Sequence, residues 1–300
     1  MSADHGPWGA RDGSDVVVPP KVREHRLGPV SVRIERAPPA AQSQRDTGQL
    51  DKGQLDKGQN PVWAVVSTAI LGAFIWYVTG SLVVAGAAIF GLFVHEYGHV
   101  LAMNRLGMGP ARIYIVPFFG GLAKSQRLPQ SEWHGVLVSL AGPIFGTLAT
   151  LPFFAAWFAT GGQAWLVGAF AISMINLINL APAPPLDGSK ALGPVLAGIH
   201  PMLEKAAMVA VGAVVVLWGV STGRWILAAF LTLALIGHLR RGMWRPEGRP
   251  LTSKESAASV GLFLAAVLIC GGSAFAALVP LAGSVEGAVG TGLRYLEFGR

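Results

Sequence analysis

Charged residues are scarce in this sequence of 300 residues. Asp, Glu, Lys and Arg together make up 13% of it, and hydrophobic residues make up 52%. A soluble domain of average composition carries roughly 25% charged residues. The shortage of charge therefore excludes an ordinary soluble domain and predicts a protein whose solvent is the lipid bilayer.

Cysteine is almost absent, because Cys270 is the only one in the sequence. A single thiol excludes an internal disulfide and a cysteine-rich zinc site. The net charge of +7 could suggest a nucleic-acid partner. However, the basic residues fall in short loops between apolar stretches, which is typical of the positive-inside pattern of membrane proteins. We therefore predict no nucleic-acid partner.

Long uncharged runs divide the chain into candidate membrane spans, each of which needs about 20 apolar residues. We place seven spans, at residues 62–79, 82–104, 134–160, 164–181, 205–222, 224–239 and 257–280. The predicted fold class is an all-α polytopic membrane protein of about six to seven transmembrane helices. Residues 206–239 could form one helix, but the Ser-Thr-Gly-Arg sequence at 221–224 favours a hairpin of two short spans.

The basic loops support this hairpin and set the predicted orientation. With it, loops 105–132 and 240–254 lie on the same side as the N-terminal tail, which the positive-inside rule makes cytoplasmic. We expect a multi-pass protein of the plasma membrane. Three regions follow: a cytoplasmic and mostly disordered tail at 1–60, a membrane core at 61–240, and a region at 241–300 with a basic loop, an extra span and a short C-terminal tail.

The tail has a polar composition with a tandem Gly-Gln-Leu-Asp-Lys repeat near its end. Such a segment cannot bury enough apolar surface to offset the entropy of the chain, so we expect most of it to be disordered. Residues 30–34 alternate with period two and could form a short strand.

A His-Glu-Tyr-Gly-His motif at residues 95–99 lies inside the second span. On a helix, His95 and His99 lie on one face, one turn apart, which suits two imidazoles binding one Zn²⁺. Glu96 beside them suits a general base acting on water at the metal. No charged residue occurs from Pro61 to Val94, so a carboxyl group here is costly unless it is used. The alternative is a pair of core histidines satisfied by backbone and water.

A candidate for the third zinc ligand follows another uncharged run. Asp187 is the first Asp, Glu, Lys or Arg after His134, and three prolines lie between Asn179 and Asp187. Prolines cannot continue a regular helix, so the fourth span should contain an unwound segment. Unwound backbone at membrane depth is tolerated against protein or a water-filled cavity. The alternative is a proline-rich surface loop.

The two motifs together resemble those of the site-2 protease family of intramembrane zinc metalloproteases. Residues 119–123 and the Ala-Gly-Pro sequence at 141–143 are also typical of that family. The resemblance implies that His95, His99 and Asp187 bind one Zn²⁺ per chain, that Glu96 is the catalytic acid and base, and that Asn179 positions substrate or stabilises the oxyanion. This chain has Ser-Lys after Asp-Gly where family members often have Gly-Arg. The segments outside the spans are too short for a PDZ or CBS domain.

By this resemblance the protein would cleave single-pass transmembrane proteins within the bilayer near its cytoplasmic side. Residues 117–123 could form a re-entrant strand that pairs with an unwound substrate, or an ordinary loop.

A transporter or channel with a His, Glu and Asp cation site is the main alternative function. No inverted repeat, the usual mark of a transporter, is evident. A third alternative is an inactive scaffold for membrane partners. The oligomeric state does not follow from the sequence.

Overall fold

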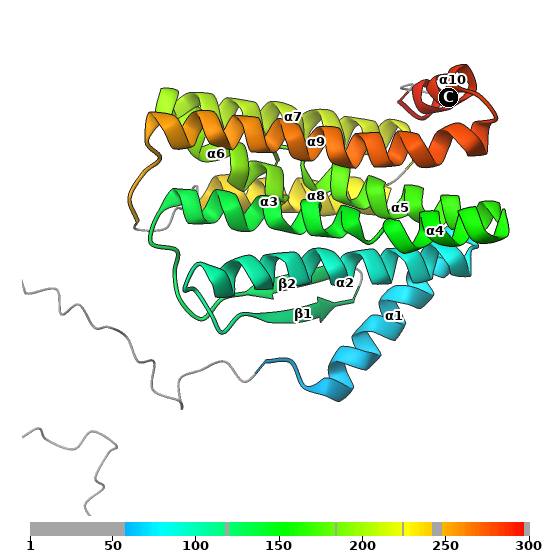
Figure 1. Cartoon of the computed structure of the whole chain (residues 1–300). Coiled ribbons are helices and arrows are strands. Elements are labelled where there is room, and N and C mark those ends of the chain that lie inside the picture. The colour runs from blue at the N-terminus through cyan, green and yellow to red at the C-terminus, as the bar shows by residue number, and fades with distance from the viewer. Residues whose placement is uncertain (1–57, 118–119, 184, 224, 242–247, 297–300) are drawn as a thin grey trace, which may run out of the picture. The chain divides into compact units, whose positions relative to one another are not determined.

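The computed structural model describes residues 58–117, 120–183, 185–223, 225–241 and 248–296 (Figure 1). The predicted strand at 30–34 lies outside these residues. Helices form most of the described chain, and the predicted helical fold class is confirmed. They are α1 (Pro61–Thr79), α2 (Leu82–Arg105), α3 (Glu132–Leu148), α4 (Leu151–Thr160), α5 (Gln163–Asn179), α6 (Asp187–Ile199), α7 (Pro201–Ser221), α8 (Trp225–Arg241), α9 (Ser253–Ala282) and α10 (Val285–Leu296).

Five helices are long and apolar enough to cross a membrane in the described part of the chain. They are α1, α2, the α3–α4 pair taken together, α7 and α9. The shorter α5 and α8 occupy the positions of the predicted fourth and sixth spans. The protein is thus a multi-pass membrane protein, while the number of spans stays a prediction. Helices α6 and α10 were not predicted, because both are shorter than a span.

The predicted hairpin of two short helices is present at residues 201–241. Helices α7 and α8 pack against each other, and Gly223 between them has a φ of 72°. Only glycine adopts that left-handed conformation without a steric penalty. The chain after α8 therefore returns to the end at which α7 begins, which lets loop 240–254 meet loop 105–132.

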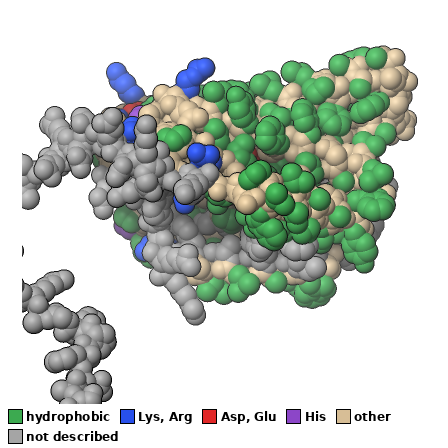
Figure 2. Space-filling view, turned by 90° about the horizontal axis from the view of Figure 1, so that it is seen from below, with side chains coloured by type: hydrophobic (Ala, Val, Ile, Leu, Met, Phe, Trp, Pro, Cys, Tyr) green, Lys and Arg blue, Asp and Glu red, His purple; other side chains and the backbone are tan. Residues whose placement is uncertain are grey.

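Hydrogen bonds join these two loops directly. The amide of Glu132 donates to the carbonyl of Arg249 over 3.0 Å, and the amide of Arg249 donates to the carbonyl of Gln130 over 3.3 Å. The visible Lys and Arg side chains gather near this end, while apolar side chains cover most of the rest of the view (Figure 2). The predicted common side of the loops agrees with these contacts.

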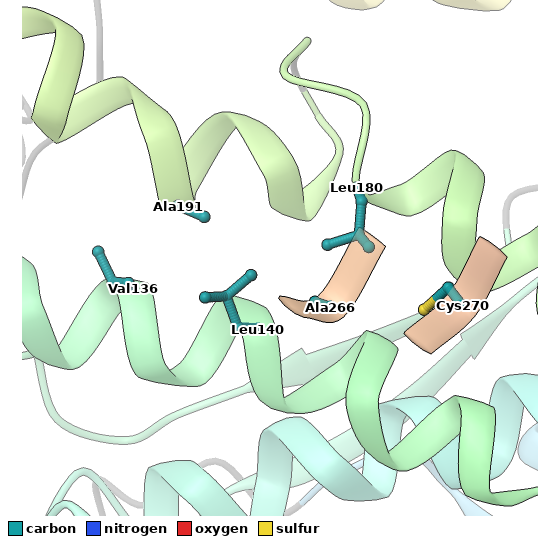
Figure 3. Close-up of a cluster of buried hydrophobic side chains, with 6 residues drawn as sticks. All are labelled: Val136, Leu140, Leu180, Ala191, Ala266 and Cys270. Atoms are coloured by element: carbon teal, nitrogen blue, oxygen red, sulfur yellow. The ribbon is translucent and has the colours of Figure 1, made fainter. Parts of the chain in front are cut away.

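The core lies where α3, α6 and α9 meet. Its buried side chains come from all three helices and from the segment after α5 (Figure 3): Val136, Leu140, Leu180, Ala191, Ala266 and Cys270. Helix α9 also contacts α5. Its Ser259 hydroxyl donates to the Ala191 carbonyl over 2.8 Å, and the Ser173 hydroxyl of α5 donates to Ser273 over 2.9 Å. The last long helix is therefore packed into the core.

A two-stranded antiparallel hairpin lies along α2 (Figure 1). Strand β1 (Arg112–Val116) pairs with β2 (Gly120–Lys124), with Ile115 opposite Gly121. The sequence predicted a strand or a loop at 117–123, and the structure has a strand there from Gly120. Strand β1 was not predicted.

Candidate metal centre

Two buried histidines and a buried aspartate converge beside α2. His95 and His99 lie one turn apart on that helix, with exposed fractions of 2% and 7%. Asp187, which is 6% exposed, is the first residue of α6. Each of the three offers one ligand atom, and these atoms lie within 4.8 Å of one another. The three predicted metal ligands thus come together although Asp187 is distant in sequence.

Three short distances define the arrangement. His95 Nε2 lies 3.1 Å from Asp187 Oδ2 and 3.1 Å from His99 Nε2. His99 Nε2 lies 3.2 Å from Asp187 Oδ2. Zinc bonds to His and Asp of roughly 2.0–2.2 Å in a tetrahedron place neighbouring ligand atoms about 3.3–3.5 Å apart. The three atoms therefore nearly match one face of a zinc coordination tetrahedron.

The outer nitrogens of both imidazoles are held by hydrogen-bond acceptors. His99 Nδ1 donates to the Val138 carbonyl over 2.7 Å. His95 Nδ1 donates to Asn176 Oδ1 over 2.8 Å. With the protons on Nδ1, the neutral rings direct their Nε2 lone pairs at each other and at the carboxylate. The lone pairs of these three atoms are directed at one point and repel one another unless a cation lies between them. Two imidazole nitrogens and a carboxylate oxygen are a ligand set that fits a divalent metal.

The end of α5 and the start of α6 position Asp187. Helix α5 ends at Asn179 and α6 begins at Asp187, and the described residues between them, 180–183 and 185–186, are not helical. The helix dipole favours a carboxylate in the first turn of α6. Asp187 Oδ1 lies 3.7 Å from Lys190 Nζ, while Oδ2 faces the histidines. The two oxygens therefore have separate partners.

Glu96 lines a cavity of about 130 Å³ together with the three ligands. Strand β2 closes one side of this cavity, with Gly121, Leu122 and Ala123 in its wall. The backbone at Gly121 approaches Glu96 so closely that an added Cβ would lie 2.8 Å from its carboxyl carbon and Oε1. The predicted catalytic base and the strand of the hairpin therefore meet at one point.

Gly142 of α3 faces the two histidines. A Cβ added there would lie 2.8 Å from His95 Nε2 and would also meet the His99 ring. Such a methyl group would occupy space beside the ligand atoms. The close approach of the two imidazoles therefore leaves space only for a glycine at the middle position of the Ala-Gly-Pro sequence.

The two asparagines of α5 have different surroundings. Asn179 lies in the wall of the cavity, as its predicted role requires, and its Nδ2 donates to the Ile175 carbonyl over 3.1 Å. Asn176, which sequence reasoning missed, contacts His95 from the side away from the other ligands. An amide inside an uncharged apolar run was a signal that could have found it.

Comparison with known proteins agrees with the part of this centre that lies on α2. Residues 83–173 match the profile of a protease family, Peptidase family M50. The predicted resemblance is confirmed. A relative named putative zinc metalloprotease sll0528, from Synechocystis sp., is 30% identical over 144 residues. That alignment covers 43% of this chain and 35% of the relative, so the chain spans about a third of the relative's length. The family is one of zinc metalloproteases with membrane domains, which supports zinc as the metal.

Proposed function

We propose that this protein is an intramembrane zinc metalloendopeptidase. The observation that carries the proposal is the convergence of two imidazole nitrogens and one carboxylate oxygen, all acceptors, beside a buried glutamate. His95, His99 and Asp187 would hold one Zn²⁺ per chain and leave a fourth coordination position open toward the cavity. Structural zinc sites are usually closed by a fourth protein ligand, so an open position favours catalysis.

Glu96 and Asn179, which line the cavity beside the three ligands, each have a role in the proposed peptide hydrolysis. When bound, zinc acts as a Lewis acid on water and on the scissile carbonyl. Glu96 accepts the proton of the attacking water and then donates it to the leaving amine. The Asn179 amide nitrogen carries two hydrogens, of which one is used by Ile175. The second would donate to the developing oxyanion.

The Glu96→Gln variant tests this assignment. Purified full-length protein in detergent is loaded with zinc and given a labelled transmembrane peptide. We expect one zinc per chain and cleavage lowered by at least about 100-fold, since general acid–base catalysis contributes that much or more. The control is Glu286→Gln on the exposed surface of α10, which should cleave normally.

Two results would overturn the proposal. One is cleavage at the wild-type rate by zinc-loaded Glu96→Gln. The other is metal transport into proteoliposomes by a protein that cleaves no peptide, which would instead support the cation-transporter alternative.

The edges of the hairpin bear on the class of substrate. The Gln59 side chain donates to the Ile115 carbonyl over 2.9 Å and accepts from the Ile115 amide over 2.8 Å. The backbone groups of Ile115 therefore point away from β2. In an antiparallel ladder, directly opposed residues point both groups the same way, inward or outward. Gly121, opposite Ile115, thus directs its backbone groups away from β1.

This outward edge of β2 supports an extended substrate beside the catalytic glutamate. Gly121 contacts Glu96, and Ala123, two residues on, has the same outward orientation. A transmembrane helix that unwinds near the cavity could add to this edge as a third strand. We therefore propose single-pass transmembrane proteins as substrates. The basic loops at this end favour cleavage near the cytoplasmic side of the plasma membrane, with the N-terminus cytoplasmic. A role in regulated proteolysis is consistent with this.

Proline substitutions on the two strands test the substrate edge. Ala123→Pro removes an outward N–H from β2, whereas Ile113→Pro, directly opposite, removes one from β1. Neither N–H belongs to the ladder between the strands. We expect Ala123→Pro to lower cleavage of a transmembrane substrate by about 10-fold or more, since each lost backbone hydrogen bond costs about 1 kcal/mol and strain adds to it. Ile113→Pro should have little effect. Equal losses for both variants would contradict strand addition at β2.

A further inference from the structure

Asn176 is a polar side chain of α5 that no solvent reaches, with an exposed fraction of 0%. Its Nδ2 donates to the Ile172 carbonyl over 2.8 Å. Because the amide nitrogen is used there, the group that faces His95 is the oxygen, which accepts from Nδ1 over 2.8 Å. The two hydrogen bonds together set both the rotamer of the amide and the position of the proton on the imidazole.

The two histidines differ in how they are held. His99 donates to a backbone carbonyl, that of Val138, which remains whatever side chain occupies position 138. His95 instead depends on a side chain. Without the Asn176 oxygen, the proton of a neutral His95 can move to Nε2, which removes the lone pair that faces Asp187 and His99.

Helix α3 leaves a niche for this amide. A Cβ added at Gly146 would lie 2.7 Å from the Asn176 side-chain carbon, so any larger residue at position 146 would displace it. A buried amide in an apolar helix is costly unless its hydrogen bonds are made. The niche and the paired amide together show a side chain that is held in place from both sides.

We propose that Asn176 is a positioning residue that fixes the tautomer and orientation of His95 and thereby sets the zinc affinity of the centre. The inference rests on the proposed function, because it takes zinc as the ligand of His95. Partners that hold the outer nitrogen of a metal-bound histidine typically account for about 10–100-fold in metal affinity. Asn176 acts through His95 and does not touch substrate.

Zinc affinity and cobalt spectra of the full-length protein test the proposal. Affinity is measured in detergent by competition with a chromophoric chelator, and cobalt replaces zinc to report coordination. Asn176→Leu removes the acceptor at similar volume, and we expect zinc affinity to fall by about 10–100-fold, with an altered cobalt spectrum. Proteolytic activity of this variant should return as zinc is raised. Asn176→Asp keeps an acceptor for His95 Nδ1 but loses the donor to the Ile172 carbonyl, and should retain more zinc affinity than Asn176→Leu.

Two controls separate positioning from packing and catalysis. Ser173→Ala removes a buried hydroxyl one turn earlier on α5, where it bonds α9, and should leave zinc affinity unchanged. Asn179→Leu should lower kcat at saturating zinc while zinc affinity stays unchanged.

Failure of the inference about Asn176 and failure of the proposed protease function would give different results. Wild-type zinc affinity in Asn176→Leu would overturn the inference, as would an equal loss of affinity in Ser173→Ala. A wild-type protein that binds zinc but cleaves no peptide would overturn the proposed protease function and leave the role of Asn176 standing. A wild-type protein that does not bind zinc would overturn both.

Discussion

Helices α1 and α5 are both apolar and both pack against α2, yet they are buried very differently. Helix α1 has two buried residues, Ser67 and Leu71. An apolar groove of about 650 Å³ opens between it and α2, with Gly72, Ala73 and Gly86 in its wall. Helix α5 has six buried residues, among them the Asn176 that contacts His95.

Hydrophobicity does not explain this difference, because lipid chains are as apolar as leucine. Both helices contain small residues, but α5 also carries polar side chains that bond neighbouring helices, Asn176 to α2 and Ser173 to α9, and such bonds hold helices together in lipid. The metal centre lies on the tightly packed side of α2, where neighbouring helices can hold its ligands in place. The open side of α2 lacks such restraint among the described residues.

The largest expected effect is a difference in zinc affinity between two variants that each add one methyl group, one on the packed side of α2 and the other on its open side. Gly142→Ala on the packed side should lower zinc affinity by more than about 100-fold, because its Cβ would meet both imidazoles. This loss exceeds the roughly 10–100-fold that typically follows when a metal ligand loses its hydrogen-bond partner. Gly86→Ala on the open side has no heavy atom within 4 Å of its new Cβ and should bind zinc normally. Zinc content after dialysis measures both. Equal zinc content in the two variants would contradict the comparison.

A medium effect is expected from larger substitutions in the two helices themselves. Ala169→Leu places extra methyl groups at a fully buried position of α5 and should cost about 1–3 kcal/mol of unfolding free energy. Ala73→Leu would fill part of the groove beside α1 and should cost nothing measurable. Unfolding in mixed micelles by a denaturing detergent measures both values. Destabilisation by Ala73→Leu alone would reverse the assignment of packed and open sides.

The smallest effect concerns single hydroxyl groups. Ser259→Ala removes the hydrogen bond from α9 to Ala191 of α6, and cross-helix bonds in membranes contribute about 0.6 kcal/mol on average. Thr68→Ala in α1 removes a bond to Ala64 of the same helix and should change stability less. The midpoint of thermal inactivation in detergent compares the two. A larger loss for Thr68→Ala would argue that α1 is held as firmly as the core.

The parts that could be predicted from the sequence are those that depend on residue type and local spacing. The positions of the apolar helices followed from their length and lack of charge. The shared face of His95 and His99 followed from helical periodicity, and the end of α5 followed from the prolines before Asp187. The turn at Gly223 followed from a short run of residues that break a helix.

The parts that could not be predicted depend on how each helix is rotated toward its neighbours. In water, an apolar stripe marks the face that a helix buries, but in lipid every face is apolar. The contact of Asn176 with His95 and the packing of α9 into the core were therefore not apparent. Strand β1 was missed although four of its five residues, Ile113, Tyr114, Ile115 and Val116, favour strands, so here the sequence did offer a signal.

The sequence by itself determined which chemical groups this protein has: two imidazoles and a carboxylate that can bind a metal, a glutamate that we propose as the base, and apolar spans that favour lipid as the surrounding medium. These properties belong to the residues and need no neighbours. Only the tertiary structure decided that Asp187 Oδ2 lies 3.1 Å from His95 Nε2, that Asn176 Oδ1 lies 2.8 Å from His95 Nδ1, and that the backbone of Gly121 in β2 lies close to Glu96. Such distances result from packing between helices that are far apart in the chain, which local sequence patterns do not encode.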